Sequence, residues 1–402
     1  MSELNTYNYP GYPAGLRYPW IFPLPSEKER DRRWEAIRNS MQTHNLDCLI
    51  IGGPFGYMSS PNNHIYYVSN FVPFYNPGMY VVFPLNGEPG LAVSGSIGPQ
   101  FIHCASETSW IKEIVEGLNP VEKVIDMIKR LKLEKGRIGI VGYRTGIFPA
   151  LANDILRQTL PSAIFEDATH VYSDAMNEVS RTSDEELAFL RKVCEIHDRS
   201  YEAVVNAFKP GVSEMELWAI AEEAIIRNGG WFPHFMLATS GPRPTFPRAP
   251  ASHHKLRMGD IVIFETSVVY GGVSCQLCYA LSMGTPEEQV GMMFDFCREL
   301  YEYSLVELEK NVKYGDIEND LVNRIHSAGY EPMTPQIHVY NMAIDMPADI
   351  LPQPGDYFTV HPNFCNKEYT AGAKFGDAVR ISEQGKVERL QAAPAKLNII
   401  SP

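Results

Sequence analysis

Residues 259–276 read GDIVIFETSVVYGGVSCQ, and this stretch decides the fold that we expect. A Gly-Asp turn pair precedes four consecutive apolar residues at 261–264, a pattern typical of a strand buried on both faces. Glu265 follows them, and a carboxylate at the end of a buried strand is costly unless it is paired, protonated or bound to something. After a Gly-Gly turn a second strand carries Gln276, so the hairpin can direct Glu265 and Gln276 into the same space.

The same arrangement recurs nearer the C-terminus. Gly355 opens a second apolar run at 357–360, and His361 lies six residues after Gly355, as Glu265 lies six residues after Gly259. One such strand alone is more often an ordinary buried strand that ends at the surface. Two strands with the same opening, the same apolar body and a polar residue at the same offset predict two related halves.

Composition limits the classes of protein to which the chain can belong. The 402 residues, 45% of them hydrophobic, predict two or three domains. A net charge of -13 without a Lys/Arg-rich stripe argues against nucleic acid or an anionic membrane as partner. We see no apolar run long enough to span a bilayer and no signal-peptide pattern at residues 1–10. The seven scattered cysteines are typical of reduced thiols, so we expect a cytoplasmic protein.

Breaks in the pattern along the chain divide it into three parts. Residues 1–25 are rich in Tyr and Pro and predict an extended aromatic arm. From Ser26 a helical pattern begins, and alternating strands and helices predict a mixed α/β domain over 26–175. A capping signal at Ser183 then opens a long amphipathic helix, so we place a second domain at 176–402.

Four stretches resemble segments of a known superfamily, that of creatinase, prolidase, aminopeptidase P and methionine aminopeptidase. They are EVSRTSDEELAFLRKVCEI at 178–196, SGPRPTFPRAPASHHKLRMGDIVIFE at 240–265, GDYFTVHP at 355–362 and KFGDAVRISEQG at 374–385. The resemblance implies an α/β (α+β) chain: an N-terminal mixed α/β domain and a C-terminal "pita-bread" domain with a pseudo-two-fold antiparallel sheet covered by helices. A two-domain chain of this length also resembles members of the creatinase branch. That resemblance implies a homodimer in which the N-terminal domain of one subunit contributes to the pocket of its partner.

The residues at the expected metal-ligand positions depart from the superfamily pattern. The peptidases that the chain resembles hold two metal ions with two Asp, one His and two Glu. The corresponding positions here carry, in that order, Glu265, Gln276, His338, His361 and Gly376. Two divalent ions close together need several carboxylates to offset their mutual repulsion. The substitutions therefore predict that the two-ion site is lost and that peptidase activity is unlikely.

Three functions remain open. The first is creatinase-like: hydrolysis, without metal or other cofactor, of a C–N bond in a small carboxylate-bearing amidine, amide or cyclic substrate, similar to creatinase and ectoine hydrolase. In this interpretation Glu265, His338 and His361 are the candidate catalytic residues. Glu265 would act as base, as nucleophile or as counter-ion of a cationic substrate, and His338 or His361 would be the acid/base partner, since imidazole titrates near neutral pH.

The second and third alternatives differ in what the pocket holds. Glu265, His338 and His361 together make the donor set of mononuclear sites, so a single divalent metal ion serving a lyase or hydrolase is the second. A non-catalytic pita-bread module that binds a partner is the third. Metal content of the purified protein distinguishes the second from the first.

Further residues are candidates for binding a small-molecule substrate. Arg248 stands where the superfamily has a histidine near the substrate, and its guanidinium can hold a carboxylate through two contacts. Lys374 and Asp377 are predicted to form an ion pair in the space left by the metal ions. The remaining candidate contacts are His234, Gln276, Tyr340, Asp377, Phe74 and Tyr75.

Overall fold

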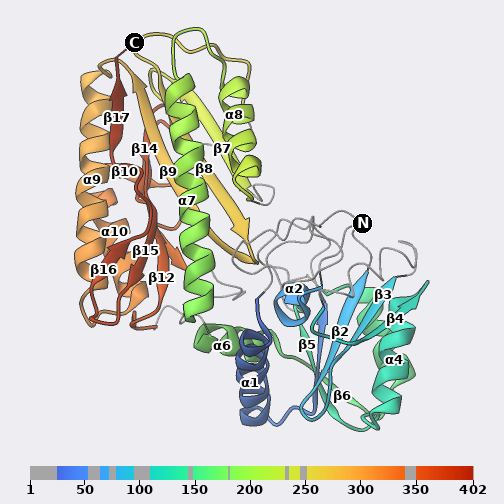
Figure 1. The fold of residues 1–402 in the computed structure, drawn as a ribbon. Helices are drawn as coiled ribbons and strands as arrows, with labels where there is room; N and C mark the ends of the chain where they lie inside the picture. The colour runs from blue at the N-terminus through green and yellow to red at the C-terminus, as the bar shows by residue number, and fades with distance from the viewer. Residues whose placement is uncertain are drawn as a thin grey trace. The chain divides into compact units, whose positions relative to one another are not determined.

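The computed structural model describes residues 25–52, 64–71, 78–94, 109–143, 148–179, 182–230, 235–244, 251–339 and 350–401. These residues form two compact units, one before residue 180 and one from residue 182 onward, each with its own sheets and helices (Figure 1). The predicted aromatic arm over 1–25 lies outside the described residues except for Pro25.

The N-terminal unit is built on one mixed sheet. Its six strands have the order β4-β3-β2-β1-β5-β6, and β1 pairs with β2 antiparallel and with β5 parallel. Helices α1, α2 and α6 bury one face of this sheet, and α4 and α5 bury the other. The mixed α/β domain predicted from the sequence is confirmed. The elements are α1 Glu27–Thr43, β1 Cys48–Gly52, α2 His64–Ser69, β2 Met79–Pro84, β3 Gly90–Ser94, β4 Glu113–Gly117, α4 Pro120–Arg130, β5 Arg137–Val141, α5 Ala150–Thr159, β6 Ile164–Asp167 and α6 Thr169–Val179.

A buried histidine in this unit predicts how its stability depends on pH. Burial lowers the pKa of His64 to about 4. Below about pH 6.5 the unfolded chain binds a proton at His64, whereas the folded chain binds this proton only below about pH 4. The stability of the folded state therefore falls as the pH drops from about 6.5 to about 4. We expect His64→Gln to reduce the loss of unfolding free energy between pH 7 and pH 5 by about 2 kcal/mol, measured by urea denaturation. An unchanged pH dependence would contradict this prediction.

The C-terminal unit has three sheets with helices outside them. The strand orders are β17-β9-β8-β7, β11-β12-β15-β16 and β10-β13-β14. Helix α7 begins at Ser183, whose side chain accepts a hydrogen bond from the backbone N–H of Glu186 at 3.1 Å, as the sequence predicts. Figure 1 shows α7 and α9 lying along the strands of this unit. The elements are α7 Asp184–Ala207, α8 Glu214–Arg227, β7 Phe235–Gly241, β8 Ile261–Tyr270, β9 Val273–Met283, α9 Glu288–Leu308, α10 Tyr314–Ser327, β10 Tyr330–Pro332, β11 Ile337–Val339, β12 Tyr357–Val360, β13 Asn363–Asn366, β14 Gly372–Lys374, β15 Asp377–Ile381, β16 Val387–Arg389 and β17 Leu397–Ile400.

The two matched openings in the sequence adopt the same local structure. Gly259 and Gly355 have φ of +88° and +94°, which favours glycine at both positions. The carboxylates of Asp260 and Asp356 each accept a hydrogen bond at 2.9 Å from the backbone N–H three residues earlier. The two matched openings therefore form the same kind of turn, as their equal sequences predict.

The hairpin of β8 and β9 places the polar residues on one face. Ser267 lies opposite Gln276, and Glu265 lies opposite Cys278. Directly opposite residues share a face of a sheet, as do residues two apart, so Glu265 and Gln276 face the same side. The expectation that Glu265 ends its strand is wrong. Strand β8 continues to Tyr270, because the β-branched run that follows Glu265 extends the strand.

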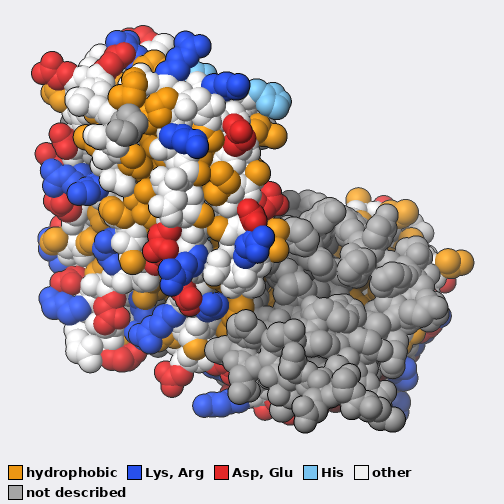
Figure 2. All heavy atoms as spheres, turned by 45° about the horizontal axis from the view of Figure 1, so that its top comes forward, with side chains coloured by type: hydrophobic (Ala, Val, Ile, Leu, Met, Phe, Trp, Pro, Cys, Tyr) orange, Lys and Arg blue, Asp and Glu red, His pale blue; other side chains and the backbone are white. Residues whose placement is uncertain are grey.

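Within the described residues, no helix is both long and apolar enough to cross a bilayer. Figure 2 shows one face of the C-terminal unit, on which Lys and Arg side chains are interspersed with Asp and Glu. The charge on this face is therefore mixed rather than of one sign.

Candidate functional site

The candidate residues that the structure describes all belong to the C-terminal unit. Glu265 and Gln276 lie on the β8–β9 hairpin, His338 lies in β11, His361 directly follows β12, and Asp377 begins β15. All but His338 have less than a tenth of their surface exposed. The remaining candidates fall outside the described residues: Arg248, His234, Tyr340, Phe74 and Tyr75.

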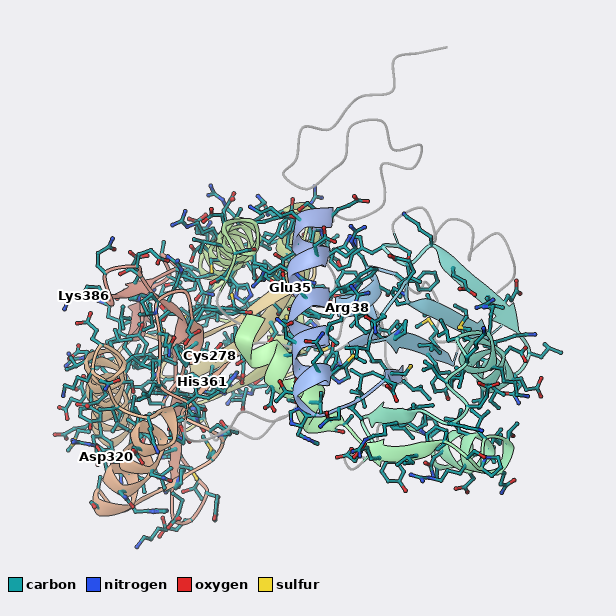
Figure 3. All side chains as sticks on the ribbon, turned by 90° about the horizontal axis from the view of Figure 1, so that it is seen from below. Glu35, Arg38, Cys278, Asp320, His361 and Lys386 are labelled. Carbon is teal, nitrogen blue, oxygen red and sulfur yellow. The ribbon has the colours of Figure 1, made fainter. Side chains whose placement is uncertain are left out.

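Two polar side chains of this unit contact His338. The Nε2 atom of His338 lies 2.9 Å from Nε2 of His361 and 2.9 Å from Oε1 of Gln276. The two histidines come from neighbouring antiparallel strands, since His338 is opposite Thr359. Figure 3 labels His361 and Cys278 among the strands of this unit. Three of the sequence-predicted residues are therefore brought together.

Polar residues near the two histidines, the buried Gln336 and Asn363 and the half-buried Glu318, hold the backbone of the histidines in place. The N–H of His361 donates to the carbonyl of Gln336 at 2.9 Å, and the amide of Asn363 donates to the carbonyl of His361 at 2.9 Å. The carboxylate of Glu318 accepts from the N–H of Gln336 at 2.9 Å. Burial raises the pKa of this carboxyl group. Sequence reasoning missed Glu318, Gln336 and Asn363; a Gln two residues before His338 and an Asn two residues after His361 were the available signal.

The surroundings of His361 favour its neutral form. Burial lowers the pKa of His361 well below its ordinary value, and the positive charge of Lys374 and the adjacent His338 lower it further. Its Nδ1 atom is buried and has no hydrogen-bond partner among the described residues, so nothing there stabilises an imidazolium. A neutral imidazole is the form in which histidine binds metal ions.

A buried ion pair occupies the neighbouring position. The ammonium of Lys374, at the end of β14, lies 2.6 Å from Oε2 of Glu265, and the two side chains are 2% and 4% exposed. The predicted pairing of Lys374 with Asp377 is wrong. Asp377 instead accepts hydrogen bonds from the hydroxyl of Tyr301 at 2.6 Å and from Nε of Arg389 at 2.9 Å. Lys374 ends β14 in one sheet and Asp377 begins β15 in another, so the two side chains have different neighbours.

Gly376 stands where the superfamily pattern has its second glutamate, and no side chain fits there. Its N–H donates to the carbonyl of Cys278 at 2.9 Å and its carbonyl accepts from the N–H of Cys278 at 2.8 Å, so this backbone joins two sheets. A Cβ atom at this glycine would lie 1.9 Å from the carbonyl oxygen of Val360 and 2.5 Å from Cα of His361. Position 376 therefore cannot supply a bridging carboxylate. Glycine has no side chain, and the surrounding backbone leaves no room for one.

These contacts test whether metal ions fit. The described residues contain no group of three or more His, Cys, Asp or Glu side chains that could hold a metal ion. A pair of ions does not fit, because neither Gln276 nor Gly376 supplies a bridging carboxylate.

A single ion does fit the donors present. The His338 Nε2 atom lies 2.9 Å from each of the other two donor atoms, close to the separation of about 3 Å between neighbouring ligands of a six-coordinate ion with bonds of about 2.1 Å. The amide oxygen of Gln276 completes this donor set. The sequence predicted Glu265 as the third metal ligand, but the carboxylate of Glu265 forms an ion pair with Lys374.

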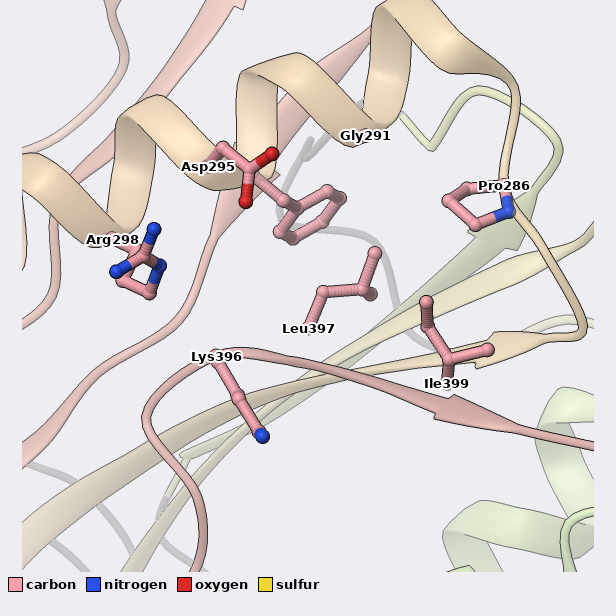
Figure 4. A pocket seen from close by; sticks show the side chains of 8 residues that line it. Pro286, Gly291, Asp295, Arg298, Lys396, Leu397 and Ile399 are labelled. Carbon is pink, nitrogen blue, oxygen red and sulfur yellow. The ribbon is translucent and has the colours of Figure 1, made fainter.

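A separate pocket of 180 Å³ lies between α9 and β17 (Figure 4). None of the candidate residues lines it. It is lined by Pro286, Gly291, Phe294, Asp295, Arg298, Lys396, Leu397 and Ile399.

Two family models match the chain one after the other. Residues 33–175 match the creatinase/prolidase N-terminal domain, and residues 188–383 match metallopeptidase family M24. The match to metallopeptidases does not support the expectation that no cofactor is needed.

The similar curated proteins are peptidases. A Xaa-Pro dipeptidase of Pyrococcus horikoshii is 20% identical over 298 residues, which is 74% of this chain and 77% of that protein. An uncharacterized peptidase of Bacillus subtilis, YqhT, is 22% identical over 384 residues, 91% of this chain and 99% of that protein. These relatives contradict two of the sequence-based predictions. One is that the chain hydrolyses a non-peptide C–N bond without metal, and the other is that peptidase activity is unlikely. The prediction equated the loss of carboxylate ligands with the loss of peptidase chemistry, although three donors remain together.

The solved structures that resemble this one share both domains. The prolidase of Thermococcus sibiricus has a TM-score of 0.78 at 19% identity and covers 92% of this chain and 99% of that one. The His350Ala variant of Escherichia coli aminopeptidase P has a TM-score of 0.70 at 15% identity, with coverage of 92% and 96%. With a creatinase/prolidase N-terminal domain followed by a pita-bread domain of the M24 type, the chain belongs to the creatinase, prolidase and aminopeptidase P superfamily.

Proposed function

We propose that this chain is a peptidase of the Xaa-Pro dipeptidase class that works with one divalent metal ion, held by His338, His361 and Gln276. The observation that carries the proposal is the pair of 2.9 Å contacts that His338 Nε2 makes with His361 Nε2 and Gln276 Oε1. The substrate class comes from the similar Xaa-Pro dipeptidase, and the metal from the metallopeptidase family that the C-terminal unit matches.

Protons alone account poorly for this cluster. The Nε2 atom of His338 carries at most one hydrogen, yet it faces a second imidazole nitrogen and an amide oxygen at equal distance. One contact is then left without a proton, or a single proton is shared between the two. A cation attracts all three donor atoms at once, and neutral imidazole and carbonyl oxygen are both ordinary metal ligands.

The protein's own groups have separate roles in this proposal. A bound divalent ion supplies a Lewis acid and lowers the pKa of a bound water. The buried Gln336 and Asn363, together with the half-buried Glu318, fix the backbone of the two histidines, so the donors are preorganised. Glu265 lies on the same face of the sheet as Gln276, and the ion pair with Lys374 holds its carboxylate in place.

Hydrolysis of Xaa-Pro dipeptides tests the proposal. Protein freed of metal with a chelator is expected to be inactive on Ala-Pro and Leu-Pro, and activity should return as one equivalent of Co²⁺ or Zn²⁺ is added. His338→Ala should lower kcat/KM by about 100-fold or more at fixed metal concentration. The matched control His253→Ala removes an exposed histidine and should leave kcat/KM unchanged. Metal-loaded protein that cleaves no Xaa-Pro dipeptide, or cleavage that survives chelation, would overturn the proposal.

A further inference from the structure

Two buried thiols lie in contact between helix α7 and strand β9. The Sγ atoms of Cys194 and Cys275 are 3.7 Å apart, and the two residues are 1% and 0% exposed. Both belong to the same apolar cluster, and Figure 1 shows α7 lying along the strand that carries Cys275. An approach of about 1.7 Å would bring the two sulfurs to the length of a disulfide bond, about 2.05 Å.

The surroundings of the two thiols differ. The side-chain amide of Gln391 donates to Sγ of Cys275 at 3.8 Å, and a donor in this position stabilises a thiolate more than a thiol. For Cys194, burial and the adjacent Cys275 raise the pKa of the thiol well above its ordinary value. Since the thiolate is the nucleophile, Cys275 is the better placed of the two to attack an oxidant, and Cys194 is the better placed to act second.

We infer that Cys194 and Cys275 form an oxidation site at which a small, uncharged hydroperoxide creates a disulfide between α7 and β9. The thiolate of Cys275 attacks one oxygen of hydrogen peroxide, the O–O bond breaks, and the hydroxide that leaves takes up the proton that Cys275 released. The product is a sulfenic acid at Cys275. The sulfur of Cys194 then attacks the sulfur of Cys275, and the sulfenic hydroxyl leaves with the proton of Cys194 as water. Two thiols are oxidised by two electrons, and one peroxide is reduced to two waters.

Burial selects the oxidant. Neither residue is more than 1% exposed, so the bulky and charged glutathione disulfide cannot reach their sulfurs in the folded chain, whereas hydrogen peroxide is little larger than water. The oxidation needs neither a metal ion nor peptidase activity. It does act next to the candidate site, because Cys275 directly precedes Gln276. The bond would join residues 81 apart in the chain and hold β9 against α7.

Peptide mass spectrometry of the full wild-type chain tests this inference. After treatment of the folded protein with hydrogen peroxide and alkylation, we expect two peptides linked through Cys194 and Cys275, which dithiothreitol separates. Cys194→Ser should remove the link and leave a sulfenic acid at Cys275 that dimedone traps, whereas Cys275→Ser should give no dimedone adduct at Cys194. The control Cys297→Ser also loses a buried thiol, one that donates to the carbonyl of Pro362, and should form the link as wild type does.

The stability of the oxidised chain gives a second measurement. Its thermal midpoint should lie about 5 °C or more above that of the reduced chain, because the bond restricts the unfolded state. Folded wild type that yields no linked peptides overturns the inference, and this result requires no variant to fold. A link that forms as fast with glutathione disulfide contradicts the selection by burial. A dimedone adduct at Cys194 contradicts the roles of the two thiols, and an unchanged or lowered midpoint contradicts the clamping of β9.

Discussion

Gly376→Ala is expected to destabilise the C-terminal unit by about 4 kcal/mol or more, one of the largest effects of any single substitution in this chain. The added Cβ would lie 1.9 Å from the carbonyl oxygen of Val360 and 2.5 Å from Cα of His361, so backbone on both sides must move. The movement would also break the paired hydrogen bonds with Cys278 that join two sheets. Native-state hydrogen exchange of the amides in β9 and β12 measures the effect directly.

The matched control is Gly385→Ala. Gly385 also has a positive φ, +71°, but an added Cβ would meet nothing within 4 Å. Its cost should be limited to backbone strain of about 1–2 kcal/mol. If Gly376→Ala and Gly385→Ala lose the same amount of unfolding free energy, the close approach of backbone to Gly376 does not add to the cost of the substitution.

Lys374→Met should be comparably severe, because it leaves the carboxylate of Glu265 buried without its cation. Removing one partner of a buried ion pair typically costs about 3–5 kcal/mol of unfolding free energy. The double variant Glu265→Gln/Lys374→Met removes both charges and should recover much of that loss. Urea denaturation of the wild type, the single variant and the double variant gives the coupling between the two residues.

A surface pair provides the comparison for this second prediction. Lys386 lies 2.7 Å from Glu309, but the two side chains are 70% and 31% exposed. Lys386→Met should therefore cost about 1 kcal/mol at most. If Lys374→Met is no more destabilising than Lys386→Met, the buried pair does not stabilise the fold in the way described.

Local signals in the sequence were sufficient for much of the fold. Helix α7 begins where the capping signal at Ser183 predicts a helix, and the Ser183 side chain accepts a hydrogen bond from the backbone N–H of Glu186. The equal offsets of Glu265 and His361 from their opening glycines predicted the internal repeat. These features depend on residues close together in the chain, where spacing alone fixes the geometry.

Long-range contacts could not be predicted in the same way. Lys374 and Glu265 are 109 residues apart, and no local pattern selects Glu265 over Asp377 as the partner of Lys374. The crowding of Gly376 by Val360 arises only when the two sheets meet. The sequence-based prediction considered each metal-ligand position separately by its residue type. It therefore missed that the three neutral donors His338, His361 and Gln276 lie close together.

Several sequence-based expectations concern features that the described residues do not include. Arg248, Tyr340 and His234 stay predicted substrate contacts, and Phe74 and Tyr75 stay predicted contributions to a partner's pocket. The homodimer and the cytoplasmic location are likewise still predictions. Light scattering of the purified protein tests the predicted homodimer, and the expected result is the mass of two chains.

The central claim is that one divalent ion, and not a pair, is held by His338, His361 and Gln276. Metal analysis of the full chain after equilibration with Co²⁺ and removal of free ion tests it most directly. The account predicts one ion per chain, lost in His361→Ala and retained in the exposed control His253→Ala. Two ions per chain, or none, would contradict it.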